Sequence, residues 1–278
     1  MKKQLRLVGI LVLALILFAG CSNTPTNDKD DSNAENKTIL VGASPTPHAE
    51  ILEQVKEVLA EQGYTLEIVE FTDYVQPNAA LDAGSIDANY FQHLPHLEDY
   101  NLKNNANLVS IASIHYEPLG IYAGKTTSLE EIPDGAQIAV PSDTSNEARA
   151  LLLLEEQGLI KVDPNVGLEA TKNDIIENPK NLDIVEIEAA QLALSLQDVD
   201  LAVINGNYAI QAGLNAQEDA LAKEEKESVA ATTYTNIIAV RSGDENREEI
   251  KALIAAIQSD DIRTFIEEKY QGAVVPLF

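Results

Sequence analysis

The sequence predicts an α/β fold built as two lobes. Residues 38–71 read as a strand–helix–strand unit, in which the apolar run TILVGA precedes a helical stripe and a β-rich segment. Such a unit places its two strands in parallel, with the helix as the crossover. The same alternation recurs along the chain and separates into two sets of similar size, one before about residue 121 and one after it. We therefore expect two mixed sheets, each flanked by helices.

The first set follows from apolar spacing and from Gly and Pro stops. Apolar residues at positions 51, 52, 55, 58 and 59 predict a helix over 48–62, which Gly63 ends. The other expected elements, in chain order, are a strand at 64–71, a short helix at 78–83, a strand at 86–90, a helix at 97–104 and a long β segment at 108–123 broken by Pro118.

The second set begins with a helical turn at 128–132 and a buried strand at 137–140. A strong helix at 146–157 follows, capped by Ser145 or Asn146 and stopped at Gly158. The remaining elements of this set are a strand at 184–187, a helix at 189–196, a strand at 201–204 and the start of a helix at 208–212.

The closing segments, a strand at 236–241 and helices at 245–258 and 262–270, have no sheet of their own. The simplest arrangement returns them to the first set. One lobe then comprises 38–121 plus 233–278 and the other 122–232. Two β-type crossings, near 120–123 and 231–237, would join them.

The N-terminal segment reads as an export and anchoring signal. Residues 1–20 combine three basic residues, an apolar run of about a dozen residues and a final Ala-Gly, which is a secretory signal pattern. Cys21 follows directly and is the only cysteine, so no intrachain disulfide can form. Its position predicts acylation, as S-diacylglycerol and N-acyl groups, and more than one chain is needed for stable anchoring. Residues 21–37 lack large apolar side chains and predict a flexible tether from the membrane to a domain outside the cytoplasm.

Composition and motifs argue against several functions. With 45 acidic and 19 basic residues, the chain has a formal net charge of −26, which disfavours nucleic acid as a partner. No Gly-x-Ser-x-Gly, P-loop, Gly-x-Gly-x-x-Gly or His-Glu-x-x-His motif is present. We therefore expect a protein that is not an enzyme and that needs no cofactor.

Residues 71–97 hold a dense group of rings in a chain that has no Trp. They are Phe71, Tyr74, Tyr90, Phe91 and His93, and no Lys or Arg lies between them. Rings without cations do not suit a nucleic-acid surface, where stacking is combined with positive charge. They suit the pocket of a small, partly apolar ligand.

Metal binding is the alternative for the same stretch. His93 and His96 have helical i, i+3 spacing and Asp99 lies further along, while His48 and His115 complete the four histidines. Histidine is a common zinc ligand. However, Pro95 separates the pair and disturbs a helix there. We predict no metal site, with surface or hydrogen-bonding roles for these histidines.

Three polar residues outside that stretch are candidates for holding a charged ligand. Arg149 lies in the first turns of a helix and could receive a carboxylate or form a salt bridge on an exposed helix face. Asn205 follows the buried strand LAVI, and ligands meet open α/β sheets at strand ends. Asn236 begins the second crossing. Both asparagines could equally serve a turn or a cap.

Several blocks in order, FTDYVQPNAALDAGSIDANYFQHLPHL, EPLGIYA, EARALLLLEEQGLI, ENPKNLDIVEIEAAQL, LAVINGNYA and NIIAVR, resemble the methionine-binding lipoproteins of bacterial ABC importers, the NlpA/MetQ family. The resemblance covers the chain from residue 38. It implies a type II periplasmic-binding fold with two crossover strands as hinge. It also implies capture of L-methionine or a close analogue, delivery to an ABC permease and its ATPase, and a location on the outer side of the cell membrane.

The resemblance also assigns roles by position. Arg149 would clamp the carboxylate, Asn205 and Asn236 would bind the amino-acid head group, and aromatic residues would line the side-chain pocket. Glu117 could meet the ammonium or be structural, and His96 is expected to be structural. The substrate-binding residues expected are Tyr74, Phe91, His93, Tyr116, Arg149, Asn205 and Asn236.

Three alternatives remain. The same fold could bind a methionine-containing dipeptide or another small amino acid. The chain could be a zinc-binding lipoprotein, or a surface lipoprotein without a transport role.

Overall fold

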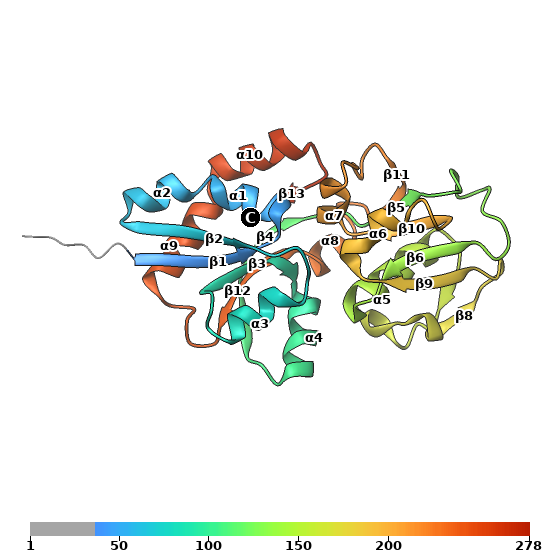
Figure 1. Ribbon diagram of the computed structural model, residues 1–278, viewed down its shortest axis with the longest axis horizontal. Coiled ribbons are helices and arrows are strands. Elements are labelled where there is room, and N and C mark those ends of the chain that lie inside the picture. Colours follow the sequence, from blue (N-terminus) through green and yellow to red (C-terminus); the bar gives the residue numbers. More distant parts are fainter. Residues whose placement is uncertain (1–36) are drawn as a thin grey trace, which may run out of the picture. The chain divides into compact units, whose positions relative to one another are not determined.

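The computed structural model describes residues 37–278 (Figure 1). The predicted signal, the predicted acylation of Cys21 and the predicted tether up to residue 36 lie outside the described residues, and Lys37, expected to end the tether, begins the first strand. The described chain forms two mixed sheets, one of six strands and one of five, which confirms the predicted fold class, and a separate two-stranded antiparallel sheet at 161–162 and 175–177. We refer to the six-stranded sheet with its helices as lobe 1 and to the five-stranded sheet with its helices as lobe 2.

Lobe 1 has the strand order β13-β4-β12-β3-β1-β2. Strand β1 pairs in parallel with both β2 and β3, while β12 is antiparallel to β3 and β4. The late strand β12 therefore returns to the first set, as predicted for closing segments that have no sheet of their own. The strands are β1 (Lys37–Ala43), β2 (Tyr64–Glu70), β3 (Ala88–His93), β4 (Leu108–Tyr116), β12 (Asn236–Arg241) and β13 (Val275–Pro276).

Helices cover the sheet of lobe 1 and bury their apolar stripes against it (Figure 1). The expected helix 48–62 is divided, because the amides of Gln54 and Val55 bond to carbonyls only three residues back. Pro95 lies in the first turn of α4, where its missing N–H costs nothing, so that helix starts earlier than expected. The elements are η1 (Pro45–Ala49), α1 (Glu50–Glu53), α2 (Lys56–Glu61), α3 (Gln76–Asp82), α4 (Leu94–Asn104), α9 (Glu248–Ile257) and α10 (Asp260–Tyr270).

Lobe 2 has the strand order β11-β5-β10-β6-β9, with β6 parallel to its neighbours and β5 antiparallel to both of its own. Its core is apolar side chains of the sheet and of one face of α5. The elements are β5 (Gly120–Ala123), β6 (Gln137–Pro141), α5 (Thr144–Glu156), β9 (Asp183–Ile187), η4 (Ala189–Gln191), α6 (Leu192–Ser195), β10 (Leu201–Ile204), α7 (Gly206–Gln211) and β11 (Ala220–Lys223).

Several boundaries differ from the sequence prediction. Residues 120–123 belong to the second sheet as β5, so the chain leaves lobe 1 at 117–119 and not at 121. Pro118 interrupts the strand within 117–119. Asp143, not Ser145 or Asn146, caps α5, because its Oδ1 accepts the Asn146 amide at 3.2 Å. No helix forms at 128–132.

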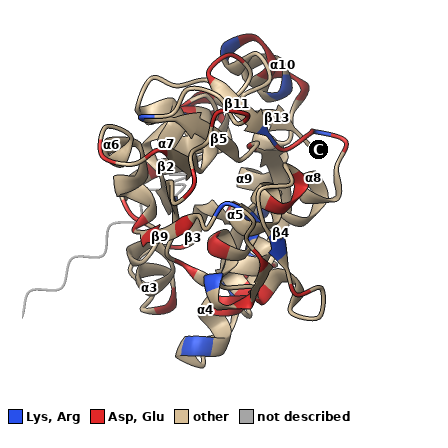
Figure 2. Ribbon diagram, turned by 90° about the vertical axis from the view of Figure 1, so that its right-hand side faces the viewer, with Lys and Arg blue, Asp and Glu red and all other residues tan. Residues whose placement is uncertain are grey.

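Short elements went unpredicted because few side chains define them. They are β7 (Lys161–Val162), η2 (Gly167–Glu169), η3 (Lys172–Asp174), β8 (Ile175–Glu177), β11, α8 (Val229–Thr233) and β13. Helix α8 lies in the second crossing, between β11 and β12. Over residues 37–278 there is no helix with the length and apolar character needed to cross a membrane. Figure 2 shows acidic residues spread over the face in view, with basic residues in fewer places.

The core of lobe 2 can be tested with one substitution. Leu151 of α5 is fully buried against the sheet. We expect Leu151→Ala to lower the free energy of unfolding by about 2–5 kcal/mol, because it leaves a cavity. Leu102→Ala in α4 is the matched control, since that side chain is 81% exposed, and its cost should stay within about 0.5 kcal/mol. Urea denaturation measures both, and equal losses would contradict the described packing.

Candidate functional site

A pocket lies where residues of both lobes and of the first crossing meet. It draws on the loop after β2, on β3, on the start of α4, on α5 and on the N-terminal residues of α7 and β12. The cavity has a volume of about 20 Å³, which is little more than one water molecule needs. An amino acid could enter only if side chains or lobes moved. The lining residues are Tyr74, Phe91, Gln92, His93, His96, Glu117, Asn146, Arg149, Asn205, Gly206, Asn207 and Asn236.

Six of the seven expected binding residues line this pocket, all except Tyr116. Tyr116 ends β4 and is fully buried, and its hydroxyl donates a hydrogen bond of 2.7 Å to Glu224 Oε2. It therefore lies behind the pocket wall and supports Glu224, which in turn binds Arg149. The other six residues come from both lobes and are far apart in the sequence, but the structure brings them together.

One wall of the pocket is aromatic. The Tyr74 ring lies 6.0 Å from that of Phe91 and 4.9 Å from that of Tyr208, measured between centroids. Phe91 also meets the edge of His96 at 5.8 Å. Tyr74 comes from lobe 1 but packs on an apolar cluster of lobe 2, and its hydroxyl donates to Asn207 Oδ1 at 2.5 Å. The aromatic wall thus crosses between the lobes.

Arg149 is buried and already paired. Its Nε and Nη2 donate to the two carboxylate oxygens of Glu224 at 2.8 and 2.6 Å, and Nη2 also donates to the main-chain oxygen of Glu117 at 2.9 Å. Burial acts to lower the pKa of Arg149, but the adjacent Glu224 carboxylate outweighs burial and raises it. The exposed salt bridge considered from the sequence is therefore wrong: the pair is buried, and Nη1 takes part in none of these bonds.

Asparagines supply unpaired polar groups to the pocket. Asn146 Oδ1 accepts from Asn205 Nδ2 at 2.8 Å and lies 3.1 Å from His93 Nε2. Within residues 37–278, the buried Asn205 Oδ1 and Asn207 Nδ2 have no hydrogen-bond partner. Such groups are rare in proteins because losing water without replacement is costly. One unpaired acceptor and one unpaired donor therefore face a site that a polar ligand could complete.

Hydrogen bonds and an ion pair join the lobes around the pocket. His96 Nδ1 of α4 lies 3.4 Å from Asp143 Oδ1, the cap of α5, and Lys103 Nζ donates to Thr144 Oγ1 at 2.7 Å. Burial acts to lower the pKa of His96, but its hydrogen bond and ion pair with Asp143 outweigh burial and raise it. The same pair overcomes burial at Asp143 and lowers its pKa to about 2. His96 thus contacts the opposite lobe.

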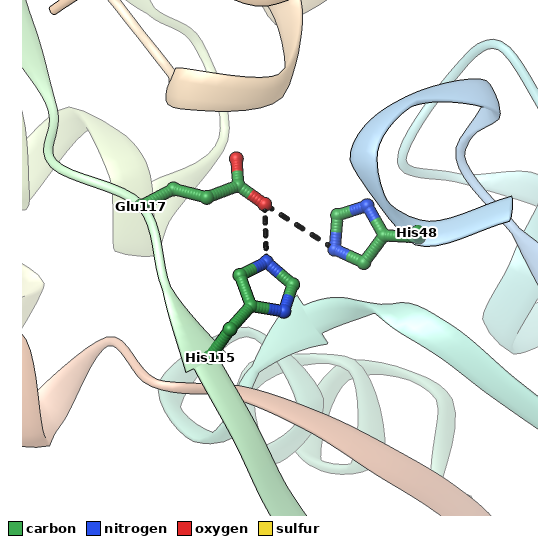
Figure 3. Close-up of side chains that lie close together, drawn as sticks. All are labelled: His48, His115 and Glu117. Atoms are coloured by element: carbon green, nitrogen blue, oxygen red, sulfur yellow. Dashed lines mark hydrogen bonds and ion pairs between the residues drawn. The ribbon is translucent and has the colours of Figure 1, made fainter. Parts of the chain in front are cut away.

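His93 and His96, considered from the sequence as metal ligands, instead contact Asn146 and Asp143. Burial, with Arg149 nearby, lowers the pKa of His93 to about 3, and its ring meets Asn146. Asp99 forms an ion pair with Lys103 instead. Three other ligand atoms do gather: His48 Nε2, His115 Nε2 and a Glu117 oxygen lie within 4.8 Å of one another (Figure 3). These are the residues within the described chain that could hold a metal.

Sequence reasoning missed Asn146, Asn207 and Glu224. Asn146 could have been found, because it lies three residues before Arg149 and so shares its helix face. Asn207 could have been found from its place two residues after Asn205. Glu224 follows a short strand and lies in a stretch of charged residues, KEEKE. The sequence around it therefore looks like an ordinary solvent-exposed segment.

Known proteins resemble this chain in both sequence and fold. The family model for NlpA lipoproteins matches residues 39–278. The methionine-binding lipoprotein MetQ of Bacillus subtilis is 41% identical over 280 residues, covering 99% of both chains. A crystal structure of a lipoprotein from Ruminococcus gnavus has a TM-score of 0.86 at 55% identity, covering 87% of this chain and 100% of that one.

The structure of a nutrient-binding protein from Burkholderia cenocepacia bound to methionine has a TM-score of 0.82 at 44% identity, covering 86% of this chain and 100% of that one. These likenesses confirm the predicted two-lobe periplasmic-binding fold and the predicted class, a membrane lipoprotein that binds rather than catalyses. The match spans nearly all of the described chain and its relatives. This chain therefore belongs to the NlpA lipoprotein family.

Proposed function

We propose that this lipoprotein captures methionine between its lobes and delivers it to an ABC permease driven by an ATPase. The observation that carries the proposal is the composition of the pocket wall. It combines buried groups of both charge signs, Arg149 and Glu117, with an aromatic surface. Such a wall suits a zwitterion with an apolar side chain. The similarity to a methionine-binding lipoprotein at 41% identity supports this ligand.

The head group would be held by the polar part of the wall. Arg149 Nη1 and the unpaired Asn207 Nδ2 can donate to a carboxylate. The unpaired Asn205 Oδ1 and the Glu117 carboxylate can accept from an ammonium. Asn236, which opens β12, lines the same space. The arrangement explains why polar groups of the pocket are buried without partners.

The side chain would lie against the rings of Tyr74, Phe91 and His93. A thioether sulfur contacts aromatic rings favourably, at about 5 Å and often at the ring edge. The neutral His93 imidazole suits this role, because burial and the nearby Arg149 lower its pKa to about 3 and so leave no charge beside an apolar chain.

Delivery requires the lobes to open and close. We place the hinge at the two crossings, residues 117–119 and 224–235, between the sheets. Ligand contacts from both lobes favour the closed form, so binding shifts the population toward it. Acylation at Cys21 and the tether after it would hold the two lobes near the permease.

The head-group contacts can be tested by calorimetry with L-methionine. Asn205→Ala and Asn236→Ala should each weaken binding about tenfold or more, because hydrogen bonds to charged groups in a buried site are worth about 1.5–3 kcal/mol. Arg149→Lys should do the same, since it keeps the charge but loses the planar fork. The matched control is Asn104→Ala, at an exposed site in α4. Unchanged affinity in all three pocket variants would refute the assignment.

Closure should depend on pH through His96. Because the closed form raises its pKa above the ordinary 6.5, the His96–Asp143 pair favours closure fully below about pH 6.5 and less as pH rises through the raised value. We expect L-methionine to bind about threefold or more weakly at pH 8 than at pH 6.5. His96→Gln should remove most of the difference. A flat wild-type profile would argue against this pair as a closure contact.

Ligand identity can be tested by thermal shift with L-methionine, D-methionine, Gly-Met and Zn²⁺. We expect methionine to raise the melting temperature, because a ligand that binds only the folded state stabilises it by mass action. A larger shift with Gly-Met would assign a dipeptide. A shift with zinc alone would favour the metal alternative, and no shift with any compound would favour a surface lipoprotein without transport.

A further inference from the structure

Glu117 is a buried carboxylate that stands between the lobes. It follows β4 in the first crossing, is 5% exposed and lines the pocket. Its Oε1 faces two imidazoles, while its other oxygen points away from them (Figure 3). His115 Nε2 lies 2.6 Å from Oε1, and His48 Nε2 lies 3.4 Å from the same atom. Both histidines are 1% exposed or less.

The partners of each ring fix where its proton sits. Tyr90 hydroxyl contacts His115 Nδ1. If that hydroxyl donates, the His115 proton must be on Nε2, facing Glu117. His48 Nε2 has two acceptors near it, Glu117 Oε1 and Asn236 Oδ1 at 2.9 Å, while its Nδ1 has no partner within residues 37–278. Both imidazoles therefore present N–H groups toward the carboxylate.

These donors favour an ionised Glu117. Burial raises the pKa of Glu117 above its ordinary value, and His48, the Arg149 guanidinium and the Asn207 amide limit that rise. A carboxylate that accepts several N–H bonds is held in its charged form. Burial lowers the pKa of His48 to about 4 and that of His115 to about 3, so the rings are neutral donors rather than counter-ions.

A buried carboxylate of this kind still needs a cation. Arg149 does not bond the Glu117 carboxylate: its Nε and Nη2 are engaged by Glu224, and it reaches only the Glu117 main-chain oxygen. A buried charge without an opposite charge is costly. The cation that would complete this site is the ammonium of the ligand in the adjoining pocket.

We propose that His48 and His115 are positioning residues, which hold the Glu117 carboxylate ionised and aimed at the ammonium group of the ligand. This inference rests on the proposed capture of an amino acid. The two histidines act through Glu117 and make the site select ligands that carry a cationic amine. The Tyr90 hydroxyl supports them by keeping the His115 proton on Nε2.

The same three side chains could be read as a zinc site, since zinc takes two histidines and a carboxylate. Zinc would require lone pairs, not N–H groups, on both Nε2 atoms. The atoms around them instead match an N–H on each Nε2, because Glu117 Oε1 lies beside both rings and Asn236 Oδ1 lies beside His48. The arrangement therefore favours a carboxylate cradle over a metal centre.

The test compares two ligands that differ by the amine alone, L-methionine and 4-(methylthio)butanoate, by calorimetry. We expect His115→Leu and His48→Leu to weaken L-methionine about tenfold or more and to change the desamino acid less than about threefold. Gln in place of either histidine restores an N–H donor and should recover part of the loss. Asn101→Ala, which removes a bond to the Leu108 main chain away from the pocket, is the control.

Each outcome is informative. Equal loss for both ligands would mean that the histidines only support the fold, and unchanged binding would mean that they do not act on Glu117. Either result would overturn the proposal. If the Leu variants do not fold, Tyr90→Phe replaces them, and it should reduce the preference for L-methionine. A thermal shift of the wild type with Zn²⁺ that is lost in His115→Gln would also overturn it. Wild-type protein that binds neither compound would instead refute the proposed function.

Discussion

The placement of one buried carboxylate, Glu117, is the constraint on which the rest of the site depends. It lies where the chain leaves the six-stranded sheet, so it belongs to neither lobe alone. Lobe 1 supplies the imidazoles of His48 and His115, and lobe 2 supplies Gly206, whose missing Cβ leaves room for it: an added Cβ would lie 2.6 Å from that of Glu117. A negative charge so enclosed must be compensated, and that requirement makes the pocket specific for a cationic group.

The positive charge in the pocket, on Arg149, already has a paired carboxylate. Glu224 accepts two hydrogen bonds from Arg149, which fix the direction of the planar, buried guanidinium. Tyr116 and the Leu119 amide also donate to Glu224, so Arg149 is supported by residues that never touch the pocket. A zwitterion would thus meet two fixed charges of opposite sign, Arg149 and Glu117, with aromatic rings beside them.

Much of this could be predicted from the sequence. Apolar periodicity predicted the central strands, and the lack of a separate sheet for the closing segments correctly predicted that β12 would join the first sheet. The site was predicted from rings at 71–97 and from isolated polar residues at strand and helix ends. Glu224 and His48 could not be found this way, because the residues they contact, Arg149 and Glu117, lie more than sixty positions away along the chain. His115 lies only two residues from Glu117, but its local pattern matches an ordinary buried strand. Pairing across such separations is set by the tertiary fold and leaves no local signature.

The most direct test is a crystal structure of the chain with L-methionine, refined at a resolution that distinguishes the two ends of the ligand. We expect a ligand enclosed by both lobes, with its ammonium nitrogen about 2.7–2.9 Å from a Glu117 carboxylate oxygen and its thioether against Tyr74 and Phe91. A ligand whose ammonium lies away from Glu117, or a metal ion bound between His48, His115 and Glu117, would contradict it.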